Sequence, residues 1–314
     1  MEELVNILKE KMENFKLDGK NNENVADKFC YMSAFLKGLT EFFNNTKITT
    51  RQENENLIQI LNFDLIQKLI EGKIIPKNSL GISLEAISQV VKQLLQRKIS
   101  QNKTQDIAQI QKDLNILIRK LFVEFVNARE KIASKFIKTI KNVSNILIYV
   151  YSLEIIYYLY YAKKAGKSFM VYVAENEKNE KIEEVLKKYD INYKFINVNS
   201  IVYYISKIDI ILTGADAVCE SGGIINKIGT SVVALCAKDY GKPFYVMTNS
   251  LKYLKMHILK QNDLIQFNQI YSSTGEPIVD YTRPEFITLF FTDKEIYLPN
   301  AIVDEIIQLF DNIK

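Results

Sequence analysis

The stretch IDIILTGADAVCESGGIINKIGTSVVALCAKDYGKPFYVMTN, residues 208–249, decides the fold of this chain. It opens with a short apolar run, Ile208–Leu212, which is typical of a buried strand. From Thr230 to Tyr240 apolar residues recur at helical spacing, and Gly241 ends the predicted helix. Phe244–Met247 predicts a second strand. Strand, loop, helix and strand together make one βαβ unit of a parallel sheet.

The predicted loop between the first strand and the helix carries most of the polar residues of this unit. In open α/β sheets, ligands bind at the carboxyl ends of the strands, which is where this loop lies. We therefore expect a ligand site here, built from residues of the loop. The loop contains Asp216, Glu220, Gly222, Gly223, Asn226 and Lys227.

Upstream and downstream of this unit, strand and helix patterns continue to alternate. Such alternation predicts right-handed crossovers and a mostly parallel sheet covered on both faces. The predicted strands are Ile146–Tyr151, Phe169–Val173, Tyr193–Val198 and Phe286–Phe291, and the predicted helices are Leu153–Lys164, Glu177–Tyr189, Ser200–Ser206 and Pro299–Asn312.

The first part of the chain has only helical patterns. Apolar stripes predict helices at Phe29–Phe43, Asn54–Gly72, Ser83–Ile99 and Asp106–Lys141, after an amphipathic N-terminal helix. The fold class is therefore α/β, with a helical N-terminal domain at residues 1–141. A Rossmann-like domain with a mostly parallel sheet follows at residues 142–314.

Composition limits the function classes. The chain has 314 residues, 47% of them hydrophobic, and its net charge of +4 gives no argument for direct nucleic-acid binding. Its three cysteines lack CxxC spacing, and no apolar run is long enough to span a membrane. We expect a cytoplasmic protein.

The remaining ionisable residues give no sign of a metal or cofactor site. His257 is the only histidine, and no cluster of acidic or thiol side chains surrounds it at metal-ligand spacing. We predict no metal and no cofactor. The charged segment Glu175–Lys188 alternates in sign and is typical of a solvated helix face.

Two sequence runs resemble a known family. GADAVCESGGIINKIGTSVVALCAKDYGKPFYV, at residues 214–246, is similar to the signature shared by the alpha, beta and delta regulatory subunits of eukaryotic translation initiation factor 2B and by the methylthioribose-1-phosphate and ribose-1,5-bisphosphate isomerases. VDYTRPEFITLFFTD, at Val279–Asp293, is most similar to the alpha branch of that family. The resemblance covers the chain from about residue 145 onward.

The family contains enzymes and non-enzymes, so the site must separate them. In the isomerases, a Thr-His-Cys run supplies a cysteine that works with an aspartate as an acid/base pair. The matching residues here are Ile148, Tyr149 and Val150, while Asp216 matches the aspartate. Valine transfers no proton, so we expect no catalytic residues and no enzyme. Cys219 is an alternative thiol, although a free cysteine commonly packs as a small apolar group.

The same resemblance implies a pocket that binds without catalysis. Asn226 and Lys227 match a substrate-binding pair, and Asp216 is expected to accept hydrogen bonds from sugar hydroxyls. Gly222 and Gly223 permit close approach of the backbone to a ligand. A further phosphate contact is expected from Tyr151 and Ser152, which lie where a strand turns into a helix. The alternative for Asn226 and Lys227 is that they only brace the loop.

Two functions follow from this resemblance. The first is a non-catalytic regulatory subunit of the guanine nucleotide exchange factor for initiation factor 2. Its expected partners are a second copy of itself, the other subunits of initiation factor 2B, initiation factor 2 with its phosphorylated alpha subunit, and a sugar phosphate. The alternative is an aldose/ketose isomerase that acts on a phosphorylated sugar with Asp216 and an unrecognised partner.

Overall fold

The computed structural model describes residues 1–18, 28–46, 50–75, 79–101, 107–140, 144–149, 152–175, 180–266, 271–272 and 275–311. The chain divides into two compact units. The helical unit contains residues 1–127, 251–255 and 305–314, and the α/β unit contains residues 128–250 and 256–304. The boundary between the two units at residues 127 and 128 falls inside one long helix, α6 (Ile107–Thr139). The second half of that helix therefore belongs to the α/β unit.

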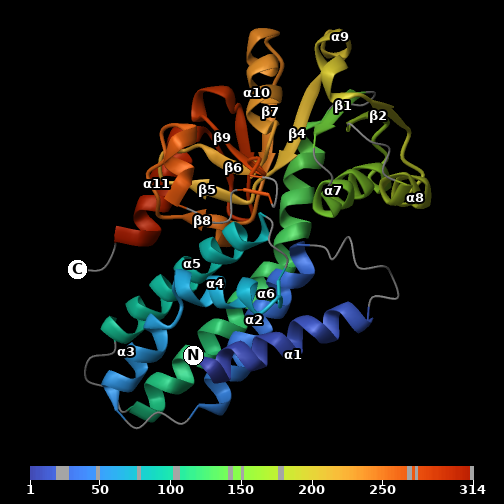
Figure 1. Ribbon diagram of the computed structural model, residues 1–314. Helices are drawn as coiled ribbons and strands as arrows, with labels where there is room; N and C mark the ends of the chain where they lie inside the picture. Colours follow the sequence, from blue (N-terminus) through green and yellow to red (C-terminus); the bar gives the residue numbers. More distant parts are fainter. Residues whose placement is uncertain are drawn as a thin grey trace. The chain divides into compact units, whose positions relative to one another are not determined.

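Helices make up most of the helical unit (Figure 1). One correction concerns the predicted helix at residues 54–72, which is two helices. Thr50 and Glu53 form a capping box at the start of the first, and the Asn62 side chain accepts from the Leu65 N–H (3.2 Å) to start the second. The bounds are α1 Glu2–Asp18, α2 Lys28–Asn45, α3 Arg51–Gln59, α4 Phe63–Glu71 and α5 Leu80–Gln101.

Helix α5 lies at the centre of the helical unit. It packs against α2, α3, α4 and the short strand β8 (Tyr253–Leu254), and most of its side chains are buried. The end of α11 (Pro299–Asp311) also docks on it: Gln93 donates to the Phe310 carbonyl (2.7 Å), and Arg97 donates to the Leu309 carbonyl (2.7 Å). These two side chains satisfy carbonyl groups that the end of a helix leaves without partners.

The α/β unit is built on the predicted sheet. Its strand order is β11-β10-β7-β4-β1-β2-β3, and every pair is parallel except β10 with β11. The prediction of a helical region followed by an α/β domain with a mostly parallel sheet is confirmed. The strands are β1 Ser144–Tyr149, β2 Phe169–Ala174, β3 Tyr193–Ile196, β4 Ile210–Gly214, β7 Phe244–Met247, β10 Leu289–Phe291 and β11 Ile296–Tyr297.

Helices cover this sheet on both faces. The second half of α6, with α7 (Leu153–Lys164) and α8 (Glu180–Lys188), shares one buried apolar core with β1 and β2. The chain then passes through α9 (Ile201–Ile205), β4 and α10 (Thr230–Asp239) to β7. From β1 the sheet grows toward β2 and β3, whereas from β4 it grows toward β7 on the other side. A right-handed crossover in this opposite direction places α10 on the other face of the sheet. There it contacts β7 and α9.

The segment predicted as a loop after β4 is a hairpin. β5 (Ala217–Cys219) and β6 (Ile224–Lys227) pair antiparallel, and β6 pairs antiparallel with β9 (Val279–Thr282). β5 is buried along its whole length, so it does not show the alternation of apolar and polar residues that would predict a strand from the sequence. Short 3-10 helices lie at Val198–Ser200, Ser250–Lys252, Gln261–Gln266 and Pro284–Phe286.

None of the helices in the described ranges combines the length and the apolar composition that crossing a bilayer requires.

The hairpin allows no side chain at Gly223. A Cβ atom there would lie 2.4 Å from the Tyr281 ring and 2.5 Å from the backbone oxygen of Thr282. We expect Gly223→Ala to reduce the free energy of unfolding by about 3 kcal/mol, measured by urea denaturation, because the backbone of β9 must move. Gly214→Ala is the matched control, since its Cβ would meet nothing closer than 4.0 Å and should cost little. Equal effects of the two substitutions would contradict this packing argument.

Candidate functional site

The sheet order places a crevice between β1 and β4. From β1 the chain moves to β2 and β3 on one side, and from β4 it moves to β7 and β10 on the other. Ligands of open α/β sheets bind where the strand order reverses in this way, outside the carboxyl ends of the strands. The residues at this edge include Tyr149 at the end of β1 and Gly214 at the end of β4.

Helix α7 begins at the same edge. Ser152 is its N-cap residue, but its side chain makes no capping hydrogen bond. The Ser152 hydroxyl faces Gly214, with its oxygen 4.0 Å from where a Cβ would stand. Ser152 therefore lies at the crevice, and its role as a phosphate contact stays a prediction. The other residue predicted for this contact, Tyr151, lies outside the described residues, as does Val150.

Asn226 is buried and already engaged. Its side-chain nitrogen donates to the hydroxyls of Thr213 (3.0 Å) and Thr230 (3.3 Å), and the Thr230 hydroxyl donates to the Lys227 carbonyl (2.6 Å). Both N–H bonds of the amide are thus used inside the protein. Asn226 braces the end of β4 against the start of α10, and a ligand can use only its oxygen.

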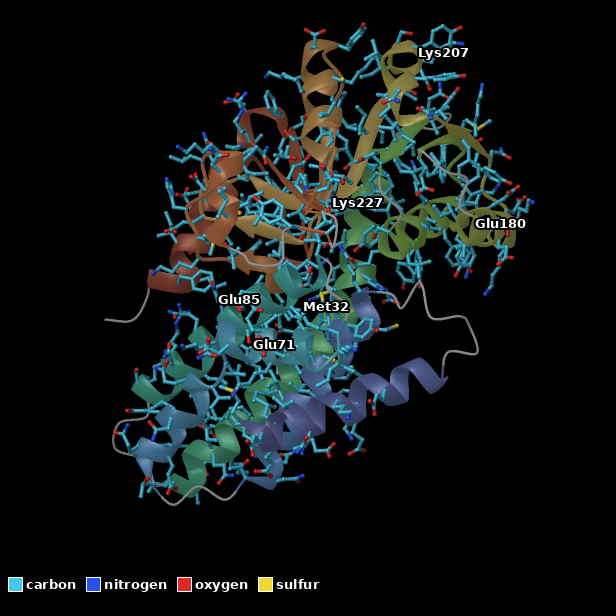
Figure 2. All side chains as sticks on the ribbon, viewed as in Figure 1. Met32, Glu71, Glu85, Glu180, Lys207 and Lys227 are labelled. Atoms are coloured by element: carbon cyan, nitrogen blue, oxygen red, sulfur yellow. The ribbon has the colours of Figure 1, made fainter. Side chains whose placement is uncertain are left out.

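Lys227 follows Asn226 on β6 and has an exposed side chain. Successive side chains of a strand point to opposite faces, so Lys227 points away from the face that Asn226 occupies. Figure 2 labels it in the α/β unit. The structure brings these two predicted residues together along one strand but gives them different surroundings.

Asp216 is only 2% exposed. It directly precedes β5, and its backbone N–H donates to the Ile225 carbonyl (2.9 Å), which extends the hairpin by one bond. Its carboxylate is thus fixed at the base of the hairpin, next to the end of β4. A buried carboxylate at this place can accept hydrogen bonds from hydroxyl groups.

The two predicted glycine contacts have a packing role. Gly222 has φ +81°, and a Cβ there would lie 3.0 Å from the Pro299 carbonyl oxygen and from a Val303 methyl group. Protein atoms therefore surround both Gly222 and Gly223, where the sequence predicted close approach of a ligand. Their contact with a ligand stays a prediction.

The N-terminus of α10 is capped from another strand. The N-cap residue is Gly229, with φ +95° and no side chain to cap with. Asp280, on β9 directly opposite Asn226, supplies the cap: its Oδ2 accepts from the N–H groups of Gly229 (2.7 Å) and Ser231 (3.0 Å). Burial raises the pKa of Asp280 to about 6, against the lowering effect of these two hydrogen bonds.

Tyr149 fixes the same turn from β1. Its hydroxyl donates to the Ile228 carbonyl (2.6 Å), and it fills the space beside Gly229 that a Cβ would need. Burial raises the pKa of Tyr149 to about 12, and the negative charges of Asp280 and Glu175 contribute to this rise. At the position where the isomerases carry histidine, this chain therefore has a phenol that braces the backbone.

Glu175 is a site residue that the sequence analysis placed elsewhere. It follows Ala174, the register partner of Tyr149, and is half-buried at the end of β2 instead of lying on a solvated helix. Burial raises its pKa, and the nearby charge of Lys227 lowers it. Its position two residues after the predicted strand Phe169–Val173 was the signal that could have identified it. Asp280 offered no comparable signal, since its role depends on a strand pairing distant in sequence.

Cys219 does not supply the missing acid/base partner. It lies in β5 with its side chain fully buried, and burial raises the pKa of its thiol far above the ordinary value. A thiol in this state forms little thiolate. Over the described residues, no group of three or more histidine, cysteine or acidic side chains is arranged to hold a metal ion.

The sequence of this chain is similar to a known family and to named relatives. The sequence model of the "Initiation factor 2 subunit family" matches residues 79–299. Translation initiation factor eIF2B subunit alpha of Dictyostelium discoideum is 34% identical over 144 residues, which cover 40% of this chain and 45% of the relative. Methylthioribose-1-phosphate isomerase of Heliobacterium modesticaldum is 30% identical over 118 residues, which cover 32% and 34%. Each of these alignments spans less than half of the relative.

Among solved structures, the tetrameric eIF2B-beta2-delta2 complex from C. thermophilum contains a chain of similar fold. The TM-score is 0.74 at 18% sequence identity, and the match covers 96% of this chain and 94% of that chain. At this identity the likeness concerns the fold, which extends through both the helical and the α/β parts.

The cap on α10 predicts a pH-dependent contribution to stability. Because the folded pKa of Asp280 is raised, its proton is bound more tightly in the folded protein, and the resulting stabilisation is present below about pH 4 and lost as pH rises through about 6. Asp280→Asn should remove this dependence. Between pH 4 and pH 8, the difference in free energy of unfolding between Asp280→Asn and wild type should shift by about 3 kcal/mol in favour of the variant, measured by urea denaturation. Asp239→Asn, at the exposed other end of α10, is the control. Parallel pH curves for Asp280→Asn and wild type would refute this assignment.

Proposed function

This chain belongs to the initiation factor 2 subunit family, and on that premise we propose that it is a non-catalytic regulatory subunit of the guanine nucleotide exchange factor for translation initiation factor 2. Its partners are the other subunits of that factor and initiation factor 2 itself, with the helical unit facing the phosphorylated alpha subunit. The relatives that carry the name of an eIF2B subunit support the other subunits as partners. It acts in the cytoplasm.

The observation that carries the non-catalytic assignment is the chemistry at the end of β1. The three residues that match the Thr-His-Cys run of the isomerases are Ile148, Tyr149 and Val150. Ile148 is buried in the core, and the Tyr149 hydroxyl is committed to the Ile228 carbonyl. Proton removal and return at a sugar carbon needs two groups, and only Asp216 remains of them.

The same edge retains the features of a binding pocket. Asp216 presents a buried carboxylate, Lys227 presents an exposed ammonium, and Ser152 stands at the start of α7. These groups suit a sugar phosphate, with the phosphate at the lysine and hydroxyls at the carboxylate. The bound ligand then stabilises the folded subunit by mass action.

An exposed apolar face supports a homodimer. Figure 1 shows α9 and α10 side by side, and these two helices are in contact. On and beside α10, Val232 is 60% exposed and Leu235 is 53% exposed. Clustered apolar side chains on a surface mark a protein interface, and a self-complementary patch of this kind fits a two-fold dimer. The face is completed by Val202, Tyr203, Ile228 and Tyr240.

The alternative function, a phosphorylated-sugar isomerase, is favoured by one observation. Asp216 keeps the place of the family's catalytic aspartate, and an isomerase is among the relatives. The two functions share a pocket and differ in turnover.

Ligand binding tests the pocket. Ribose 5-phosphate should raise the melting temperature of the wild-type protein, and Lys227→Ala should weaken its affinity about tenfold at low salt, because a charge-assisted contact is lost. The loss should shrink at high salt, since screening also weakens the wild-type attraction. Asp216→Asn should reduce the ligand-induced shift as well. Lys207→Ala is the matched control, because this exposed lysine stands apart from Lys227 in the same unit (Figure 2).

If neither substitution changed the ligand-induced shift, the pocket would lie elsewhere. Turnover of ribose 1,5-bisphosphate or methylthioribose 1-phosphate that is abolished in Asp216→Asn would favour the isomerase.

The oligomeric state tests the apolar face. Wild-type protein should sediment as a dimer at micromolar concentration, and Leu235→Arg should sediment as a monomer with an unchanged circular dichroism spectrum. Ile265→Arg, which places the same charge at an exposed apolar residue of the 3-10 helix Gln261–Gln266, is the control. A Leu235→Arg variant that remains dimeric would exclude this face as the interface.

A further inference from the structure

Two centres of positive charge lie at the carboxyl edge of the sheet. One is the ammonium group of Lys227 at the end of β6, and the other is the N-terminus of α10, where aligned peptide dipoles attract anions. Each centre already has a carboxylate of the protein close to it. The contacts of those two carboxylates determine what else this edge accepts.

Asp280 occupies the N-terminus of α10. Its side chain is buried, at 4% exposure, and Oδ2 takes the N–H groups of Gly229 and Ser231 that a bound phosphate would otherwise use. Within the described part of the chain, the second oxygen, Oδ1, is buried without a hydrogen-bond partner. The helix end is therefore neutralised from within the protein, and the desolvated carboxylate still has acceptor capacity.

Glu175 stands near Lys227. It directly follows Ala174, which is paired with Tyr149, and the Tyr149 hydroxyl contacts Ile228, the residue after Lys227. Glu175 is half-buried, so water screens its charge less than it screens a fully exposed carboxylate. An anion that approaches Lys227 therefore meets Glu175 as well.

We propose that Glu175 and Asp280 are specificity-determining residues of this edge: while both are ionised they repel anionic groups, and an anion binds tightly only when they take up protons. This inference rests on the ligand pocket proposed above. The ligand that suits the ionised edge is rich in hydroxyl groups and carries at most one phosphate, because repulsion from the two carboxylates grows with each negative charge on the ligand.

The pH range follows from the burial of the two acids. Burial raises the pKa of Glu175, and it raises that of Asp280 to about 6. Asp280 passes through its pKa between pH 7.5 and pH 5.5, so the edge loses negative charge and anion binding strengthens as pH falls. The other ionisable groups at this edge are Tyr149 from β1, Lys227 from β6 and Asp216 before β5.

The test measures sulfate affinity by calorimetry on the full chain at pH 7.5 and pH 5.5. Sulfate keeps a constant charge across this range, whereas a phosphate ester would itself titrate. The variants are Glu175→Gln and Asp280→Asn, and Asp239→Asn removes the same charge from the opposite end of α10 as a matched control.

Wild-type protein and the Asp239→Asn control should bind sulfate about tenfold more tightly at pH 5.5 than at pH 7.5. Glu175→Gln and Asp280→Asn should each bind more tightly than wild type at pH 7.5, because each substitution removes a negative charge. Asp280→Asn should also show a smaller change with pH. At pH 7.5 the wild type should also prefer ribose 5-phosphate to ribose 1,5-bisphosphate, and Asp280→Asn should reduce that preference.

A pH dependence that is unchanged in Asp280→Asn would assign the titration to another group and overturn the inference. Weaker sulfate binding by both variants at pH 7.5 would also overturn it, because the carboxylates would then only hold the fold. If Asp280→Asn does not fold, Glu175→Gln alone gives the result. Sulfate and sugar phosphates that bind neither wild type nor variants would instead reject the proposed pocket itself.

Discussion

The α/β unit depends on the way the N-terminus of α10 is held. A helix leaves its first N–H groups without partners, and the N-cap residue, Gly229, has no side chain to satisfy them. Asp280 does this from β9, Tyr149 holds the neighbouring carbonyl from β1, and Asn226 ties the same turn to the end of β4. Three strands of two different sheets are thus fixed to one turn, which directly follows Lys227.

The sequence was informative where local patterns decide structure. The βαβ unit, the parallel sheet and the helical region could be predicted because apolar periodicity directly reflects burial. The hairpin of β5 and β6 could not, since a strand buried along its length has no alternation to detect. The break between α3 and α4 at Asn62 was not predicted, because the apolar stripe continues across it. The Asn62 side chain starts α4 through a hydrogen bond to the backbone, which the apolar pattern does not reflect. Asp280 was beyond reach because its function depends on a pairing with Asn226, 54 positions away.

Two side chains bear on whether the carboxyl edge of the sheet could transfer a proton. The Tyr149 hydroxyl donates a hydrogen bond to the Ile228 carbonyl, so it stiffens the turn. The same O–H group is then not available to a ligand. Cys219 is held in an apolar strand where a thiolate is unfavourable. The residues at this edge keep hydrogen-bond acceptors and a cation, which on the function proposed above would allow binding without proton transfer.

The helical unit is closed by the last residues of the chain, because Gln93 and Arg97 of α5 hold the final carbonyls of α11. During synthesis, residues 1–127 therefore leave the ribosome long before their remaining partners, residues 251–255 and 305–314, exist. At ordinary translation rates this interval lasts on the order of ten seconds or more. The helices of residues 1–127 therefore wait with α5 incompletely covered until the end of α11 has been synthesised.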